Sequence, residues 1–133
     1  MDIEKLLKES RVVAIVGASP AEDKASNHVF NYLKKQGYKV IPVNPTVDKI
    51  GETTCFPNLI AVPEKVDVVD IFRRSEDCGP IIDEAIKIGA KAIWMQEGIV
   101  NEEAGEKARK AGLMVVMDHC IMKEHYKLHF GLH

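Results

Sequence analysis

The sequence lacks the features that mark several specialised classes of protein. Its 133 residues contain only three cysteines, far apart and without a CxxC pair, so neither a disulfide framework nor a zinc ribbon is indicated. The 18 Lys and Arg residues face 20 Asp and Glu residues, which speaks against a general nucleic-acid binder. No apolar run approaches the roughly 18 residues that span a bilayer. The first ten residues, MDIEKLLKES, lack the apolar core of a signal peptide, so we expect a cytoplasmic protein with no membrane partner.

Two nucleotide-binding motifs are also missing. After Gly17 the sequence continues ASPAED, so the second and third glycines of the dinucleotide fingerprint GxGxxG are absent. The second apolar run ends in PVNP and supplies no carboxylate for the ribose of a nicotinamide dinucleotide. These absences weigh against NAD without excluding it. No Walker A pattern is present, so phosphoryl transfer from ATP is unsupported.

What the sequence does contain is an alternation of strand and helix signals. The apolar runs show no polar alternation, which is typical of strands covered on both faces. Between them, apolar residues recur at helical spacing. This predicts a single α/β domain over residues 1–133, a Rossmann-like doubly wound five-stranded parallel sheet flanked by helices. The predicted strands are Val12–Val16, Val40–Val43, Val66–Phe72, Ala92–Met95 and Leu113–Met117, and the helical stripes are Val29, Phe30 and Leu33, then Ile81, Ile82, Ala85 and Ile86, then Ala104, Ala108 and Ala111.

Local signals refine this prediction. Asn101 precedes two glutamates and is expected to cap the helix that follows. The segment Pro45–Lys65 contains three prolines and a glycine, so we expect a loop with at most a short helix at Asn58–Ala61. A long irregular connection of this kind is often functional. We expect a last helix within Cys120–Leu132 that packs Ile121, His125 and Leu128 on the body.

The exit from the first strand is the most informative stretch. Gly17 permits a sharp turn before a helix, and the small residues Ala18 and Ser19 leave the backbone amides accessible. Amides at a helix N-terminus form an anion site. Ser19 or Ser26 can add a hydroxyl, and Lys24 adds a positive charge. An ordinary tight turn explains the glycine equally well.

Further motifs at successive strand ends give the chain a family resemblance. In order they are GAS (Gly17–Ser19), PVNP (Pro42–Pro45), Lys49 and Gly51 in the next loop, VDVVDIFRR (Val66–Arg74), WMQEGI (Trp94–Ile99) and VMDHC (Val116–Cys120). From about Arg11 to His125 the chain resembles the CoA-binding domain family, which includes small stand-alone proteins and is similar to the N-terminal domain of the succinyl-CoA synthetase α subunit. The resemblance implies a Rossmann-type fold and coenzyme A as ligand.

The resemblance also implies a set of ligand-binding residues. Lys24, Lys49, Arg73 and Arg74 are candidates for contacting the phosphates of CoA, and Phe72 and Met95 for contacting its adenine or pantetheine arm. The family often has arginine at the position of His119, which puts a charge contact from that position in doubt. The complete expected set is Gly17, Ala18, Ser19, Pro20, Lys24, Ser26, Val43, Asn44, Pro45, Lys49, Phe72, Arg73, Arg74, Met95 and Gln96.

Nothing in the sequence forms a defensible catalytic constellation. Glu97 and Asp118 could act as acid and base, but Asp118 is better explained as a loop-holding acceptor. Cys120 is better explained by packing than by reactivity. His125, His129 and His133 have helical spacing, yet a helix end is a poor metal scaffold.

We therefore expect a binding module for CoA or a short acyl-CoA, acting as a carrier, sensor or regulator. Three alternatives stay open: an NAD(P)-dependent oxidoreductase, an acyl-CoA-handling enzyme subunit completed by a partner chain, and a structural domain with a vestigial site. A homodimer or an unidentified protein partner is compatible with the sequence.

Overall fold

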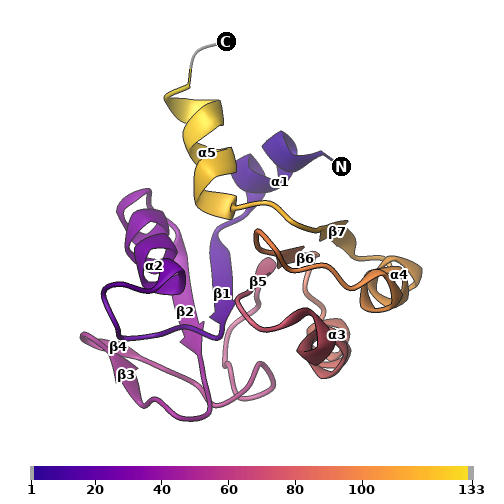
Figure 1. Ribbon diagram of the computed structural model, residues 1–133, viewed down its shortest axis with the longest axis horizontal. Helices are drawn as coiled ribbons and strands as arrows, with labels where there is room; N and C mark the ends of the chain where they lie inside the picture. Colours follow the sequence, from indigo (N-terminus) through magenta and orange to yellow (C-terminus); the bar gives the residue numbers. More distant parts are fainter. Residues whose placement is uncertain (1, 132–133) are drawn as a thin grey trace.

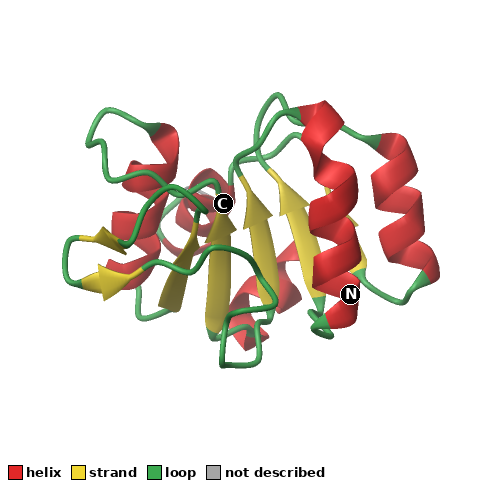
Figure 2. Cartoon of the chain, turned by 90° about the horizontal axis from the view of Figure 1, so that it is seen from below, coloured by secondary structure: helices red, strands yellow, loops and turns green. Residues whose placement is uncertain are grey.

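The computed structural model describes residues 2–131, and it contains the predicted five-stranded parallel sheet (Figures 1 and 2). The strand order is β2-β1-β5-β6-β7. All five strands are parallel. The order in which they are added to the sheet reverses at β1, because β2 lies on one side of β1 and β5 lies on the other. The strands are β1 (Val12–Val16), β2 (Lys39–Val43), β5 (Val68–Ile71), β6 (Ala92–Met95) and β7 (Met114–Val116).

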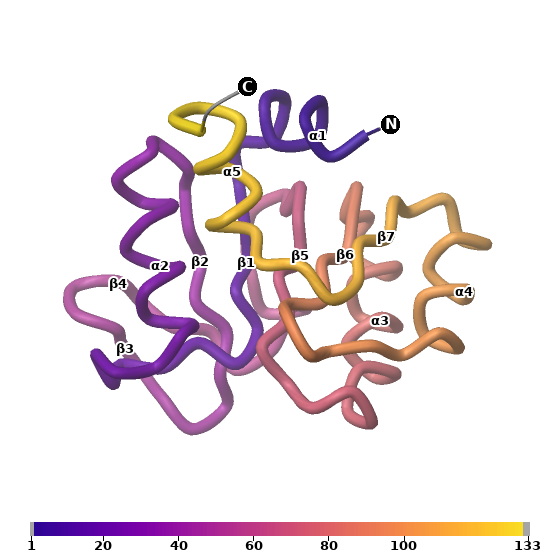
Figure 3. The backbone as a smooth tube through the Cα atoms, turned by 45° about the horizontal axis from the view of Figure 1, so that its top comes forward, coloured from indigo at the N-terminus to yellow at the C-terminus, as the bar shows by residue number. Residues whose placement is uncertain are grey.

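Helices cover both faces of this sheet, as the sequence predicts. One face carries α1, α2 and α5, and the other carries α3 and α4 (Figure 1). The first and last helices, α1 and α5, contact each other over that first face (Figure 3). Within residues 2–131 no helix is both long and apolar enough to cross a membrane. The helices are α1 (Ile3–Glu9), α2 (Ala25–Lys35), α3 (Cys78–Lys87), α4 (Glu102–Lys110) and α5 (Ile121–His129).

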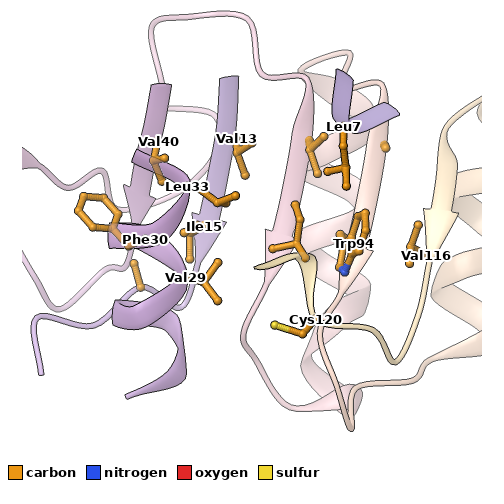
Figure 4. Packing of buried hydrophobic residues seen from close by; sticks show 14 of the residues in the cluster. Leu7, Val13, Ile15, Val29, Phe30, Leu33, Val40, Trp94, Val116 and Cys120 are labelled. Carbon is orange, nitrogen blue, oxygen red and sulfur yellow. The ribbon is translucent and has the colours of Figure 1, made fainter. Parts of the chain in front are cut away.

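Alternation along each strand divides the core into two clusters. Val13 and Ile15 of β1 face the α2–α5 side, where Trp94 is fully buried beneath Leu7 and close to Cys120 (Figure 4). The intervening residues of β1 face α3 and α4. Because both faces are covered, the strands show no polar alternation in the sequence.

Several local predictions are confirmed. Asn101 caps α4, since its side chain accepts a hydrogen bond from the amide of Ala104 at 2.9 Å. Ile121 and His125 of α5 are buried and Leu128 packs against the same cluster, as expected. Leu132, the predicted end of that helix, lies outside the described residues.

Other predictions are wrong. The stretch expected to be a loop contains a small antiparallel hairpin of β3 (Lys49–Ile50) and β4 (Thr53–Thr54), whereas residues 58–61 form bends and turns, which agrees with the expectation of at most a short helix there. Ala111 is exposed at the C-cap of α4 and does not belong to its buried stripe. Helix α1 was not predicted at all; Asp2 caps it, and it buries Leu6 and Leu7.

One core residue carries a potential charge. Asp70 pairs in register with Ile15 and Trp94, and its side chain is completely buried. Among residues 2–131 neither of its carboxyl oxygens has a hydrogen-bond partner. Burial raises the pKa of Asp70 well above its ordinary value of 3.8, because the carboxylate would lose its hydration. Burial therefore disfavours the ionised form of Asp70 in the folded protein.

This burial predicts a pH dependence of stability. The unfolded chain releases the Asp70 proton at the ordinary pKa while the folded chain retains it, so the free energy of unfolding falls as the pH rises above about 4. Asp70→Asn removes that component, and the difference in unfolding free energy between the wild type and this variant should change steadily over that range. Urea denaturation at a series of pH values measures it. Asp48→Asn, at an exposed position, should leave the slope intact; parallel curves for the wild type and Asp70→Asn would contradict the prediction.

Candidate functional site

The candidate site is built around the turn that leaves β1. Gly17 has φ +89°, and a Cβ added there would lie 2.5 Å from the carbonyl oxygen of Phe72 and 3.1 Å from Cδ of Arg73. Its amide donates to the carbonyl of Val43 at 2.9 Å. The ends of β1, β2 and β5 therefore meet at this glycine, where the winding of the sheet reverses and ligands of open α/β sheets bind.

Two asparagine side chains fix the orientation of this turn. The amide of Asn44 donates to the carbonyl of Ala18 at 2.8 Å, and the amide of Asn27 donates to the carbonyl of Ser19 at 2.9 Å. In residues 2–131 the backbone amide of Ser19 donates no hydrogen bond, and the amide of Ala25 opens α2 without an intrahelical acceptor. These two amides and the positive end of the helix dipole favour an anion here.

A pocket of about 310 Å³ opens on the other side of Gly17. Its base consists of the ends of β1 and β2, one wall of residues 57–59, and the other of the start of α3. The lining is largely apolar, but it also contains one cation and three carboxylates. The lining residues are Val16, Gly17, Val43, Pro45, Pro57, Asn58, Leu59, Arg73, Glu76, Asp77, Pro80, Ile81 and Glu84.

The two predicted arginines have different environments. Arg73 lines the pocket, its side chain is 46% exposed, and its nearest carboxylate is that of Asp77 at 4.0 Å. Arg74 does not line the pocket; it is 76% exposed and is held by Asp77 at 3.0 Å and Glu76 at 3.4 Å. The hydrogen bond that Arg74 donates to Asp77 and the charges of the two carboxylates raise the pKa of Arg74. Arg73 is thus the cation that the structure places beside the turn.

Five further residues of the predicted set do not line the pocket. Three of them, Pro20, Lys24 and Lys49, are exposed, and Ser26 is buried in the first turn of α2. Ala18 has no exposed surface and belongs to the core cluster on the α2 side.

Phe72, Met95 and Gln96 do not line the pocket. Phe72 packs against the core, and Met95 is 0% exposed. Gln96 is buried and accepts from the amide of Ile121 at 3.1 Å, which caps α5. The apolar contact expected from Met95 has no exposed surface to act through; the apolar lining comes instead from residues such as Leu59 and Ile81.

The possible catalytic side chains are held by their neighbours. Asp118 accepts from the amide of Gly98 at 2.7 Å, as expected of a loop-holding carboxylate, and Glu97 pairs with Lys123 at 2.9 Å. Cys120 is buried in the core. The rings of His125 and His129 stack 4.0 Å apart, and His133 lies outside the described residues. No cluster of three potential metal ligands occurs in the part of the chain that the structure describes.

Known proteins have sequences similar to this one. The Bacillus subtilis protein YneT is 36% identical over 124 residues, which are 93% of this chain and 92% of YneT. Acetate–CoA ligase [ADP-forming] II of Archaeoglobus fulgidus is 31% identical over 113 residues, 82% of this chain but only 17% of the ligase. This chain therefore spans about a sixth of that ligase.

Solved structures agree. A hypothetical protein from Pyrococcus horikoshii OT3 superposes with a TM-score of 0.93 and 39% identity, over 96% of this chain and 89% of its own. A dinucleotide-forming acetyl-coenzyme A synthetase of Ca. Korarchaeum cryptofilum, in complex with phosphate and ADP, superposes with a TM-score of 0.72 and 32% identity, over 86% of this chain and 26% of its own. Residues 11–126 match the CoA binding domain as a family. The chain belongs to the CoA-binding domain family.

Proposed function

We propose that the protein binds coenzyme A, or a short acyl-CoA, across the carboxyl ends of β1, β2 and β5. The observation that carries this proposal is the meeting of an open amide turn with Arg73 at Gly17, in a chain of the CoA-binding domain family. A phosphorylated adenosine needs an anion site and an adjoining pocket with apolar surface, and we assign these two features to opposite sides of that glycine.

The phosphates are assigned to the α2 side of the crevice. The amides of Ser19 and Ala25 face no protein acceptor within residues 2–131, and amides at a helix N-terminus bind anions. Lys24 precedes α2 and Lys49 lies on the nearby hairpin, both exposed. Arg73 lies between this side and the pocket. Coenzyme A carries a pyrophosphate and a 3′-phosphate, so several separate cations suit it.

The adenine base is assigned to the pocket. Its lining carries three carboxylates against one arginine, so the net negative charge would repel a phosphate placed inside. The uncharged adenine fits the apolar bottom of the pocket. The exocyclic amine of adenine can donate a hydrogen bond to one of the carboxylates. The charge distribution thus orients the ligand, with the phosphates over Gly17 and the base between residues 57–59 and α3.

We infer a binding role in the cytoplasm, as a carrier, sensor or regulator, and assign no catalytic residue. The carboxylates of Asp118 and Glu97 are engaged by Gly98 and Lys123, and Cys120 is buried. An exposed, unengaged acid or nucleophile would be needed beside the ligand for chemistry of its own.

The first test compares ligands. Isothermal titration should show coenzyme A binding about tenfold or more tightly than dephospho-CoA at low salt, because the 3′-phosphate gains charged hydrogen bonds. The difference should shrink at about 1 M salt, where the Debye length is about 3 Å. NAD, which lacks the 3′-phosphate, should bind no better than dephospho-CoA. Equal affinities for CoA and dephospho-CoA would rule out the assigned phosphate contacts, and no binding of CoA would rule out the function.

The second test uses the adjacent arginines as a matched pair. Arg73→Ala should weaken CoA about ten- to a hundredfold, since a hydrogen bond to a charged group contributes about 1.5–3 kcal/mol. Arg74→Ala should change affinity less than about threefold, because Arg74 is engaged by Asp77 and Glu76 outside the pocket. Both side chains are well exposed, so melting temperatures should hardly move. Equal losses for the two variants would contradict the assignment.

A further inference from the structure

The pocket owes its second wall to an unusual crossover. Between β2 and β5 the chain crosses the α3 side of the sheet without a helix, through the hairpin β3–β4 and an irregular segment. Phe56, at the start of that segment, is tied to β2: its amide donates to the carbonyl of Pro42 at 3.0 Å, and its carbonyl accepts from Asn44 at 2.8 Å. Leu59, three residues on, is buried in the core cluster on the α3 side.

A single side chain links this wall to the opposite one. Oε1 of Glu84, on α3, accepts a hydrogen bond from the amide of Leu59 at 2.8 Å. This is the only hydrogen bond of the Glu84 side chain among residues 2–131. Both Glu84 and Leu59 line the pocket. The bond therefore joins the two walls where they meet, and it limits how far apart they can move.

We propose that Glu84 is a positioning residue for the ligand, which holds residues 57–59 at the separation that the adenine base requires. This rests on the proposed function, because the pocket is taken to hold the base of coenzyme A. A helical crossover would fix such a wall through many contacts. Here the segment has few anchors, so the loss of one charged hydrogen bond allows the wall to move.

The effect should be confined to the nucleotide half of the ligand. The turn at Gly17 is held by the side chains of Asn27 and Asn44, and Glu84 hydrogen-bonds to neither of them. Glu84 therefore acts on the base and leaves the phosphate contacts in place. Adenosine 3′,5′-bisphosphate, which is the nucleotide end of CoA without its pantetheine arm, is the probe for this half.

Three variants separate the hydrogen bond from the charge. Glu84→Ala removes both. Glu84→Gln keeps an oxygen that can accept from Leu59 but removes the charge. Asp83→Asn is the control, because Asp83 is on the same helix but pairs with Lys107 outside the pocket. Amide hydrogen exchange at Leu59 and calorimetric titration with CoA and the bisphosphate provide the measurements.

We expect Glu84→Ala to speed amide exchange at Leu59 about tenfold. It should also lower the affinity for CoA and the affinity for the bisphosphate, each about tenfold. Glu84→Gln should restore both affinities to within about threefold of the wild type. Asp83→Asn should change none of these quantities. Restoration by glutamine of both exchange and affinity supports positioning through the hydrogen bond.

Other outcomes overturn the proposal. Faster exchange at Leu59 in Glu84→Ala with unchanged affinities would show that the wall does not touch the ligand. A lower affinity for CoA with an unchanged affinity for the bisphosphate would show that the adenine base lies outside this pocket. Losses as large in Glu84→Gln as in Glu84→Ala would assign the effect to charge alone. If the wild-type protein binds no CoA, the proposed function itself is wrong. That outcome is distinct from a failure of the role of Glu84, which would appear only in a protein whose wild type binds CoA.

Discussion

The site depends on one steric constraint, the contact between the exits of β1 and β5. Gly17 lies so close to the carbonyl of Phe72 that a Cβ would approach it to 2.5 Å, and its φ of +89° favours glycine. This contact brings Arg73 against the turn and sets the turn at the point where the winding of the sheet reverses. A substitution at Gly17 would disturb the sheet itself, so Arg73 and Glu84 are the cleaner probes of binding.

Charge is divided across this point. On the α2 side the amides of Ser19 and Ala25, the helix dipole and Lys24 favour anions. On the α3 side Asp77 and Glu84 disfavour them. A ligand with several phosphates and an uncharged base fits both sides in only one orientation, with its phosphates on the α2 side and its base on the α3 side. The charges of the site would therefore orient such a ligand. A simple phosphate ester would use only the first side.

The sequence predicts the part of the structure that follows from burial. The five strands are continuous apolar runs because the sheet is covered on both faces, and Asn101 signals its helix by a cap. Helix α1 escaped prediction because only Leu6 and Leu7 of its seven residues are buried. The hairpin escaped because strands of two residues have no period to detect.

The residues of the site were less predictable, because the sequence does not show which way a side chain at a strand end points or which residues far apart in the chain come together. Met95 and Gln96 end a strand that does reach the carboxyl edge, but the side chain of Met95 points into the α3–α4 cluster and that of Gln96 turns to cap α5. No sequence period reveals which way the last residue of a strand faces. Glu84 reads as an ordinary helix carboxylate, because its partner is a backbone amide 25 positions away.

The two halves of the site should therefore respond differently to substitution. The proposed anion site consists of main-chain amides, so changes to Ser19 or Ala25 that keep the backbone conformation would leave its donors intact. The pocket wall depends on a side-chain bond from Glu84 to an irregular segment, so a single substitution can change its width. Divergence in ligand preference among chains with this fold would then be expected at the wall, where affinity can be altered without disturbing the contact between β1 and β5.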